Sequence, residues 1–293
     1  MRIKSFDSDG AILYLVATPI GNLSDFSYRA IEVLNNVDII YAEDTRNSSI
    51  LLRHYNIKTK LLSYHEFNQD IKSEEILNEL KSGKKIAIIS DAGLPVISDP
   101  GYKISTLAIE NGFRVSTIPG ASAGISALIS SGIVPMPYLF FGFLESQKTK
   151  RIKQLLNLKN LGYTMIFYEA PHRIHDTLND ILDVLGDRNI CIARELTKIN
   201  EEFIRGRVSE IINYDNIKGE IVLIVEGAKE ENISNLDPMS EIDQRIALGT
   251  KTSQAIKEVA NEFNLDKNEL YKKYLDYKNK GEWNWIFVSN ISI

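Results

Sequence analysis

A loop rich in Gly, Pro and Asp follows one of the most apolar segments of the chain. Residues 85–89 have the length and β-branching of a buried strand, and residues 102–111 have a helical pattern. The loop between them, residues 90–101, holds two Gly, two Pro and two Asp, whereas a plain connection needs only about two to six residues. Because ligands bind at the carboxyl ends of strands in open α/β sheets, this loop predicts half of a small-molecule site. The alternative is that this loop is a structurally elaborate turn that binds no ligand.

Strand-like and helix-like segments alternate on both sides of this loop. This alternation predicts a mostly parallel sheet covered by helices on both faces. Ser24 or Asp25 is the expected cap of the first helix. Two other strand ends, at residues 18–22 and 119–124, also carry Pro and Gly, and three such loops at one sheet edge predict a shared pocket. The expected strands are residues 12–17, 38–42, 59–64, 85–89 and 113–118.

The chain divides into three expected regions. Residues 12–136 form the first α/β domain, and two prolines in residues 134–137 indicate a linker. A second α/β pattern covers residues 138–229. Residues 237–281 are helical throughout, with helix–turn–helix spacing and a basic end that predicts either RNA contact or a solvated face. The apolar residues 283–288 suggest a short docking strand.

Composition excludes several classes of protein. The net charge of −5 argues against a surface that binds nucleic acid everywhere, but it leaves room for a local basic patch. The single cysteine, Cys191, lies in an apolar run and predicts a buried thiol without disulfides, as in the cytoplasm. No apolar run is long enough for a membrane span.

Several common site motifs are missing from the sequence. There is no G-x-x-x-x-G-K-[ST] phosphate loop and no G-x-G-x-x-G after a strand. The four histidines have no ligand spacing, so we expect no metal site.

Seven separated motifs in this order resemble the tetrapyrrole-methylase superfamily, and more narrowly its members that methylate the 2′-hydroxyl of a cytidine in 16S rRNA. The resemblance covers about residues 13–277. It implies two α/β domains with S-adenosylmethionine (SAM) in the cleft between them, a homodimer, and the decoding region of the small (30S) ribosomal subunit as substrate. The motifs are residues 13–23, 42–46, 90–101, 119–123, 167–173, 193–198 and 218–220.

The resemblance also implies which residues contact the cofactor. The loops of the first domain and the strand ends of the second would share the contacts. These residues are Pro19, Leu94, Ile97, Ser122, Ala123, Tyr168, Ala170, Ala193, Gly219 and Glu220.

Methyl transfer to a ribose hydroxyl needs alignment and a group that accepts or stabilises charge on the oxygen. Asp44, at a strand end beside the expected cleft, is the first candidate for the base. An ion pair with Arg46, or a helix cap, is its alternative role. Lys218 is the second candidate, as stabiliser of the alkoxide or, with a pKa lowered by burial, as base.

RNA contact is expected at four further positions: Arg46, His172, Arg173 and Arg194. Ion pairs of the arginines with Glu43, Glu169 or Glu195 are the alternative. Asp91 and Asp99 are expected to shape their own loop through side-chain hydrogen bonds. Two other functions stay open: a SAM-dependent enzyme with a small acceptor such as a tetrapyrrole, and a non-enzymatic module that binds RNA through its C-terminal helices.

Overall fold

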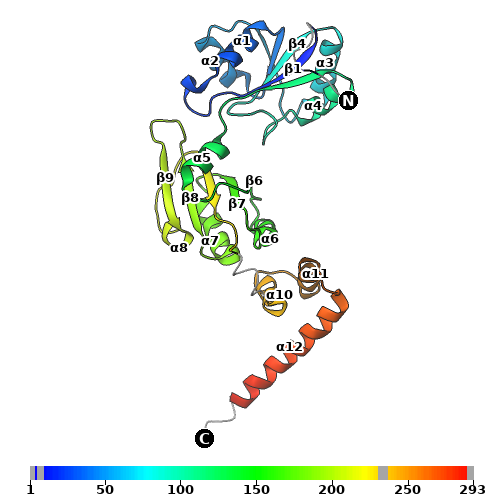
Figure 1. Cartoon of the computed structure of the whole chain (residues 1–293), viewed down its shortest axis with the longest axis vertical. Helices are drawn as coiled ribbons and strands as arrows, with labels where there is room; N and C mark the ends of the chain where they lie inside the picture. Colours follow the sequence, from blue (N-terminus) through cyan, green and yellow to red (C-terminus); the bar gives the residue numbers. More distant parts are fainter. Residues whose placement is uncertain (1–3, 5–9, 230–236, 289–293) are drawn as a thin grey trace.

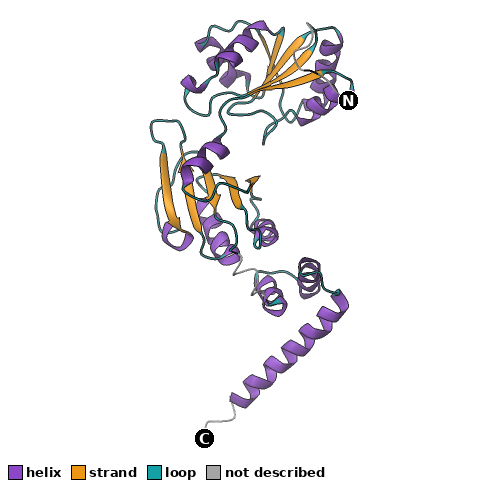
Figure 2. Cartoon of the chain, in the orientation of Figure 1, coloured by secondary structure: helices purple, strands orange, loops and turns teal. Residues whose placement is uncertain are grey.

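The computed structural model describes residue 4, residues 10–229 and residues 237–288, with side chains as far as residue 278. The chain is elongated: two α/β units lie one above the other, and three helices follow at the far end (Figures 1 and 2). No helix in the described part of the chain is both long enough and apolar enough to cross a membrane.

The first unit is built on a fully parallel sheet in the order β3-β2-β4-β1-β5. The predicted parallel sheet is therefore confirmed. Buried side chains form one core on each of its faces. The strands are β1 (Ile12–Val16), β2 (Ile39–Ala42), β3 (Lys60–Ser63), β4 (Lys85–Ile89) and β5 (Arg114–Ile118), and the helices are α1 (Tyr28–Asn36), α2 (Thr45–His54), α3 (Gln69–Lys81) and α4 (Tyr102–Glu110).

The expected cap of α1 is wrong. Ser24 and Asp25 lie in a short 3₁₀ helix (Leu23–Asp25), and the cap is Ser27, whose Oγ accepts a hydrogen bond from the Ala30 backbone N–H at 3.1 Å. Ser27 has the extended backbone that a helix cap requires.

The second unit contains a mixed five-stranded sheet in the order β6-β7-β10-β8-β9. Only β6 and β7 are parallel. Helix α5 (Ala123–Ser131) precedes the predicted boundary at residue 136, yet it packs on this second sheet. The other elements are β6 (Tyr138–Phe143), β7 (Thr164–Glu169), β8 (Asn189–Arg194), β9 (Glu202–Arg207), β10 (Ile221–Val225), α6 (Lys148–Leu158), α7 (Ile174–Leu185) and α8 (Val208–Ile211).

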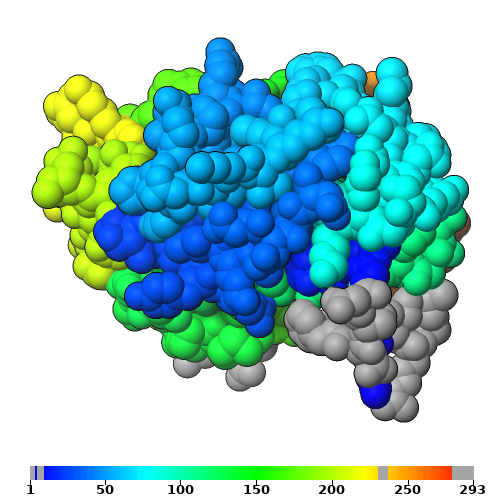
Figure 3. All heavy atoms as spheres, turned by 90° about the horizontal axis from the view of Figure 1, so that it is seen from above, coloured from blue at the N-terminus to red at the C-terminus, as the bar shows by residue number. Residues whose placement is uncertain are grey.

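Viewed from above, the first unit covers most of the molecule, and the region around β9 projects beyond its edge (Figure 3). Gly124 at the start of α5 lets this helix approach the sheet closely, because an added Cβ would lie 3.2 Å from the Phe140 ring. The chain therefore crosses between the units directly after the third Pro/Gly loop.

The C-terminal region consists of α10 (Pro238–Ala247), α11 (Thr252–Glu262) and α12 (Lys267–Val288), which share a small core. Lys159 of the second unit joins it by an ion pair with Glu241 at 2.5 Å and a hydrogen bond to Gln244. The predicted strand at residues 283–288 is wrong, because α12 continues through it. No proline interrupts α12, and a single glycine such as Gly281 is tolerated in a helix at a cost of about 1 kcal/mol.

Candidate active site

The three Pro/Gly loops of the first unit meet, as the sequence predicted. Thr18 and Gly93 form an isolated antiparallel bridge between the first and second loops. The third loop approaches the first so closely that a Cβ on Gly120 would lie 2.8 Å from the Ala17 Cβ. The carboxyl ends of β1, β4 and β5 therefore form one continuous rim.

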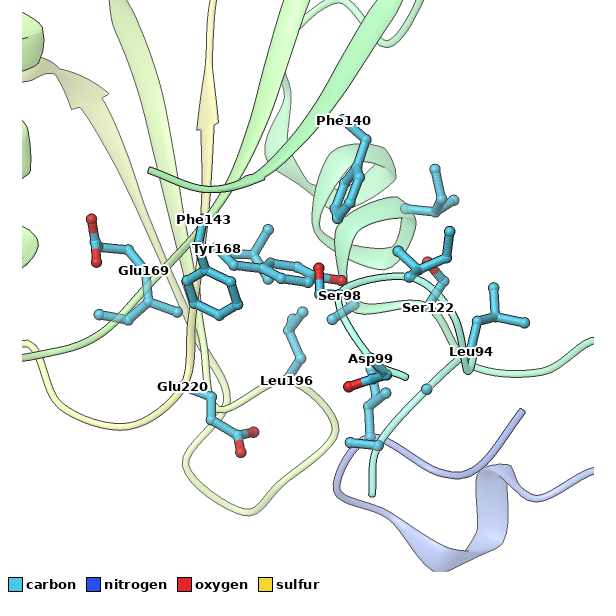
Figure 4. Close-up of a pocket in the computed structure, with 18 of the residues that line it drawn as sticks. Leu94, Ser98, Asp99, Ser122, Phe140, Phe143, Tyr168, Glu169, Leu196 and Glu220 are labelled. Carbon is cyan, nitrogen blue, oxygen red and sulfur yellow. The ribbon is translucent and has the colours of Figure 1, made fainter. Parts of the chain in front are cut away.

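A cavity of about 830 Å³ lies between this rim and the second sheet. Figure 4 shows Leu94, Asp99 and Ser122 on one side of it and Phe143, Tyr168 and Glu220 on the other. Its size is typical of a small-molecule site. We call it the main cavity; it is lined by Ile20, Asp91, Ala92, Gly93, Leu94, Ile97, Ser98, Asp99, Ser122, Ala123, Ile125, Tyr138, Phe140, Phe143, Tyr168, Glu169, Ala170, Pro171, Glu195, Leu196, Gly219, Glu220, Ile221 and Val222.

The loop of residues 90–101 enters the main cavity in a strained conformation. Val96 and Ser98 have φ angles of 78° and 67°, in the left-handed region that non-glycine residues seldom occupy. Gly101 packs against Val96, and a Cβ there would lie 2.8 Å from the Val96 Cγ2. Such strain is concentrated at functional sites, where the surrounding structure enforces it.

The opposite wall is held by a small network of charges. Lys198 Nζ bonds Glu195 at 2.9 Å and Glu220 at 3.0 Å. The hydrogen bond from Lys198 holds the pKa of Glu195 below its usual value. Gly219, at φ 87°, lies against Glu195, and a Cβ there would be only 2.4 Å from the Glu195 Cγ. This contact explains why the position requires glycine.

The first unit touches this wall through its own first loop. A Cβ on Gly21 would lie 2.7 Å from the Lys198 Cγ. The two units therefore meet beside the main cavity, and glycine makes the contact possible.

Eight of the ten expected cofactor residues line the main cavity. Pro19 and Ala193 do not. Pro19 lies between Thr18, which is buried in the rim, and Ile20, which does face the cavity. Ala193 is fully buried in the core under the cavity floor. The eight are Leu94, Ile97, Ser122, Ala123, Tyr168, Ala170, Gly219 and Glu220.

Sequence reasoning missed the aromatic residues of β6. Tyr138 and Phe140 alternate along the strand and both face the cavity. A bulge between Phe140 and Gly142 then shifts the register, so that Phe143 also lines it. The alternation was a usable signal, but the bulge could not be seen in the sequence.

Asp44 lies outside the main cavity, in an open recess beside it. It caps α2, and both of its carboxylate oxygens accept hydrogen bonds from the Arg46 guanidinium, with an Oδ2 to Nη2 distance of 2.6 Å. The Arg46 guanidinium holds the pKa of Asp44 at about 2. The structure thus has the ion pair and helix cap of the alternative interpretation. We call this the Arg46 recess; it is lined by Glu43, Asp44, Thr45, Arg46, Ser63, His65, Phe67 and Asp91, and has a volume of about 530 Å³.

Asp91 lines both hollows, so the main cavity and the Arg46 recess adjoin. The expectation that Asp91 shapes its own loop is wrong, because its carboxylate accepts from the Asp44 N–H at 3.3 Å and from Asn47 Nδ2 at 2.9 Å. These partners belong to the start of α2, a helix that we did not predict from the sequence. Asp91 therefore braces the border between the two hollows.

Asp99 differs from Asp44 in its surroundings. Burial, followed by the charges of Glu43 and Asp91, raises the pKa of Asp99 to about 7. Burial and Asp91 also raise the pKa of Glu43. Among the described residues, no cation forms an ion pair with Asp99.

The other expected polar residues lie outside the main cavity. Lys218 is exposed, directly before Gly219, and its carbonyl accepts a bond from Arg194 at 3.4 Å. Arg194 pairs with Glu202 at 2.5 Å. Arg173 pairs with Glu169 at 3.3 Å and donates to the Leu144 carbonyl. His172 is exposed at the turn after β7.

The main cavity suits SAM in chemical terms. Its aromatic wall of Phe140, Phe143 and Tyr168 offers apolar surface for a nucleobase. The carboxylates Asp91 and Asp99 complement a sulfonium charge. Gly93 and Gly219 also line the cavity. No group of His, Cys, Asp and Glu residues in the described part of the chain could hold a metal ion.

The rim and cleft define the class of protein. The model of the tetrapyrrole (corrin/porphyrin) methylases matches residues 12–212, and the chain belongs to this family. Two solved structures share the fold at low identity. Uroporphyrin-III-C-methyltransferase from Thermus thermophilus has a TM-score of 0.55 at 14% identity, covering 74% of this chain and 94% of that one. Diphthine synthase has a TM-score of 0.58 at 13% identity, covering 74% and 89%.

Sequence relatives narrow the assignment within that family. A protein of Bacillus subtilis (strain 168) is 48% identical over 285 residues, which is 93% of this chain and 98% of the relative. One from Synechocystis sp. is 43% identical, covering 92% and 99%. Both are named ribosomal RNA small subunit methyltransferase I, and this chain belongs with them.

Proposed function

We propose that the protein is a SAM-dependent methyltransferase that methylates the 2′-hydroxyl of a cytidine ribose in the decoding region of 16S rRNA. The observation that carries the proposal is the adjoining pair of hollows, which share Asp91. One is an apolar, aromatic cavity for the cofactor, and the other is an open recess for the acceptor nucleotide. The relatives named for small-subunit rRNA support this acceptor.

In this proposal the main cavity holds the cofactor. Leu94, Ile97, Ser122 and Ala123 contact it from the rim. Tyr168, Ala170, Gly219 and Glu220 contact it from the second unit. Bound SAM supplies an electrophilic methyl group on a sulfonium, and the protein aligns that group with the acceptor oxygen.

The Arg46 recess has the features of a site for an unstacked nucleotide. The Phe67 side chain is 96% exposed, an unusual position for a large aromatic residue that a base could stack on. Arg46 is 89% exposed in its side chain and is oriented by Asp44, so it can bind a phosphate while paired. A flexible RNA strand could fill this recess, whereas a rigid tetrapyrrole has no phosphate for Arg46.

Further RNA contacts are proposed at the edge of the second unit and at the C-terminal helices. His172, Arg173 and Arg194 lie near the turns after β7 and β8, and Lys218 would stabilise charge on the acceptor oxygen. Each guanidinium keeps one terminal nitrogen, Nη1 of Arg173 and Nη2 of Arg194, that makes no bond to the described residues and would contact phosphate.

We also propose a homodimer and three structural units, with the bounds expected from the sequence, residues 12–136, 138–229 and 237–281, except that α5 packs with the second unit. The apolar side chains of Ile129 on α5 and of Val134 and Met136 after it are exposed close together in sequence. A second copy of the chain could cover them. A ribosomal substrate would place the protein in the cytoplasm.

The decisive experiment compares acceptors. Small ribosomal subunits purified from cells lacking this protein are incubated with the enzyme and SAM labelled on the methyl group. Incorporation, followed by mapping of ribose methylation, is expected at one cytidine. Incorporation into a tetrapyrrole but not into the subunits would overturn the RNA acceptor, and failure to bind SAM by calorimetry would overturn the enzyme.

A further inference from the structure

We infer that Glu43, rather than Asp44, is the carboxylate that accepts the proton of the acceptor hydroxyl. The inference rests on the proposed function and adds a catalytic residue to it. The Arg46 recess, which we assign to the acceptor nucleotide, is lined by three carboxylates: Glu43, Asp44 and Asp91. A base for the acceptor hydroxyl must lie within hydrogen-bond reach of it, and therefore in this recess. Asp99 lines the main cavity instead and is left to the cofactor.

Within the described part of the chain, Glu43 is the one carboxylate of the three without a partner. Both oxygens of Asp44 accept hydrogen bonds from the Arg46 guanidinium. The Asp91 carboxylate accepts from the Asp44 N–H at 3.3 Å and from Asn47 Nδ2 at 2.9 Å. The Glu43 side chain makes no hydrogen bond or ion pair with any residue that the structure describes. Its oxygens therefore stay available to a hydroxyl that enters the recess.

The position of Glu43 in the fold places it on the inner side of the recess. It directly follows β2, at the carboxyl end of the parallel sheet, and is partly buried. The charge of Asp91, which lines both hollows, acts on Glu43, and the charge of Glu43 acts on Asp99 in the main cavity. Phe67 and Arg46, by contrast, are exposed. A nucleotide whose base stacks on Phe67 and whose phosphate binds Arg46 would carry its ribose on the inner side, toward Glu43.

The surroundings of Glu43 make it a stronger base than an ordinary glutamate. Burial is the main cause that raises its pKa, and the charge of Asp91 is the next. His65 opposes them, because a positive imidazolium favours the ionised carboxylate. A base works best when its pKa lies near the working pH, whereas the pKa of Asp44 is held at about 2. The groups that face Glu43 are His65 and Glu66 after β3, Asp44 at the start of α2, and Asp91 and Asp99 in the loop after β4.

The proposed step balances without any further reactant. The ribose 2′-oxygen forms a bond to the methyl carbon, the carbon–sulfur bond breaks with its electron pair left on sulfur, and the hydroxyl proton moves to a carboxylate oxygen of Glu43. Because the recess is open, release of this proton to solvent returns the carboxylate to its starting state.

The first test measures the pKa of Glu43 without any substrate. Glutamate carboxyl carbons are labelled with ¹³C, and the SAM-free protein is titrated by NMR. The resonance lost in Glu43→Gln should titrate above the ordinary glutamate value of 4.5. In Asp91→Asn, which removes a neighbouring negative charge, that resonance should titrate at lower pH. A resonance that titrates at or below 4.5 in the unsubstituted protein would overturn the inference.

The second test is single-turnover methylation of small subunits at saturating SAM and saturating subunits, followed as a function of pH. Glu43→Gln should lower the rate at least about 100-fold and remove its rise with pH, while SAM affinity by calorimetry stays unchanged. Glu43→Asp, which keeps a carboxylate on a shorter side chain, should recover part of the rate and its pH dependence. Asp44→Asn should keep the pH dependence. Glu110→Gln, on the exposed end of α4, is the matched control and should behave as the unsubstituted protein.

Three outcomes would count against Glu43. A Glu43→Gln protein with the original rate and pH dependence would overturn the inference and leave the proposed function intact. Weaker binding of small subunits with an unchanged rate at saturation would make Glu43 a contact to the nucleotide instead of the base. If the unsubstituted protein binds SAM but methylates no subunits, the proposed function fails, and the inference fails with it.

Discussion

Thr18 and Gly93 lie 75 residues apart, yet their backbones bond each other twice. The Thr18 N–H donates to the Gly93 carbonyl at 2.8 Å, and the Gly93 N–H donates to the Thr18 carbonyl at 3.1 Å. The Thr18 hydroxyl adds a bond to the Ser90 carbonyl at 3.1 Å. This buried clasp joins the ends of β1 and β4 and sets the shape of the rim.

Replacing Thr18 by Val tests the clasp. The change keeps the shape but removes the buried hydroxyl, and should lower the free energy of unfolding by about 1–3 kcal/mol. Because the rim loosens, SAM affinity should also fall. Thr59→Val is the control: its hydroxyl bonds the Leu34 carbonyl at 2.6 Å, away from the cavity. Denaturant unfolding and calorimetry would contradict the idea if both variants kept full SAM affinity.

Gly219→Ala should damage the cavity wall. A left-handed backbone costs a non-glycine residue about 1–2 kcal/mol, and here the new Cβ would also collide with Glu195. We expect SAM binding to weaken by at least about tenfold, equivalent to about 1.4 kcal/mol. Gly83→Ala shares the positive φ, at 92°, but meets nothing within 4 Å. Equal SAM affinities for the two variants would disprove the role of the Glu195 contact.

Phe67→Ala should selectively weaken the binding of the rRNA substrate. Loss of stacking on one base costs about 1–3 kcal/mol, so KM for small subunits should rise by about 5- to 150-fold. Stability and SAM affinity should stay unchanged, because Phe67 is exposed. Tyr28→Ala removes another aromatic side chain, 94% exposed, at the start of α1. An equal effect of both changes on KM would rule out specific stacking at Phe67.

Asp99 should make the protein less stable at high pH. Its pKa is raised from 3.8 to about 7 in the folded state, so between these values the folded protein binds a proton that the unfolded chain has lost. The free energy of unfolding therefore falls as pH rises through this window. Asp99→Asn should gain stability over the unsubstituted protein between pH 4 and pH 8. A stability difference that stays constant over that range, measured by urea unfolding, would contradict the raised pKa.

The sequence predicted the parts of the structure that depend on local pattern. The apolar runs at residues 12–17 and 85–89 became central strands, because buried parallel strands need continuous apolar side chains. The three Pro/Gly loops met because parallel strands bring their carboxyl ends to one edge. Cys191 is buried, as its apolar surroundings indicated.

Other features depend on contacts between distant segments. The antiparallel pairing of β10 with β7 and β8 follows from chain crossings that no local pattern records. The raised pKa of Asp99 arises first from burial and then from the charge of Glu43, at the end of another strand. From the sequence we expected Asp44 to be the base, with an ion pair to Arg46 as its alternative role, and Asp99 only to shape its loop. The carboxylates near Asp99 could not be read from local pattern.

The docking of α10 has a mechanical consequence. Lys159 and Asn160 tie the C-terminal helices to the second unit, through Glu241, Gln244 and Glu262. Any hinge motion that widens the cleft to exchange one cofactor molecule for the next would swing α12, about 33 Å long, together with the second sheet. An RNA bound by both α12 and the Arg46 recess would resist that motion. The anchoring of these helices would then determine the order in which the product and the used cofactor leave.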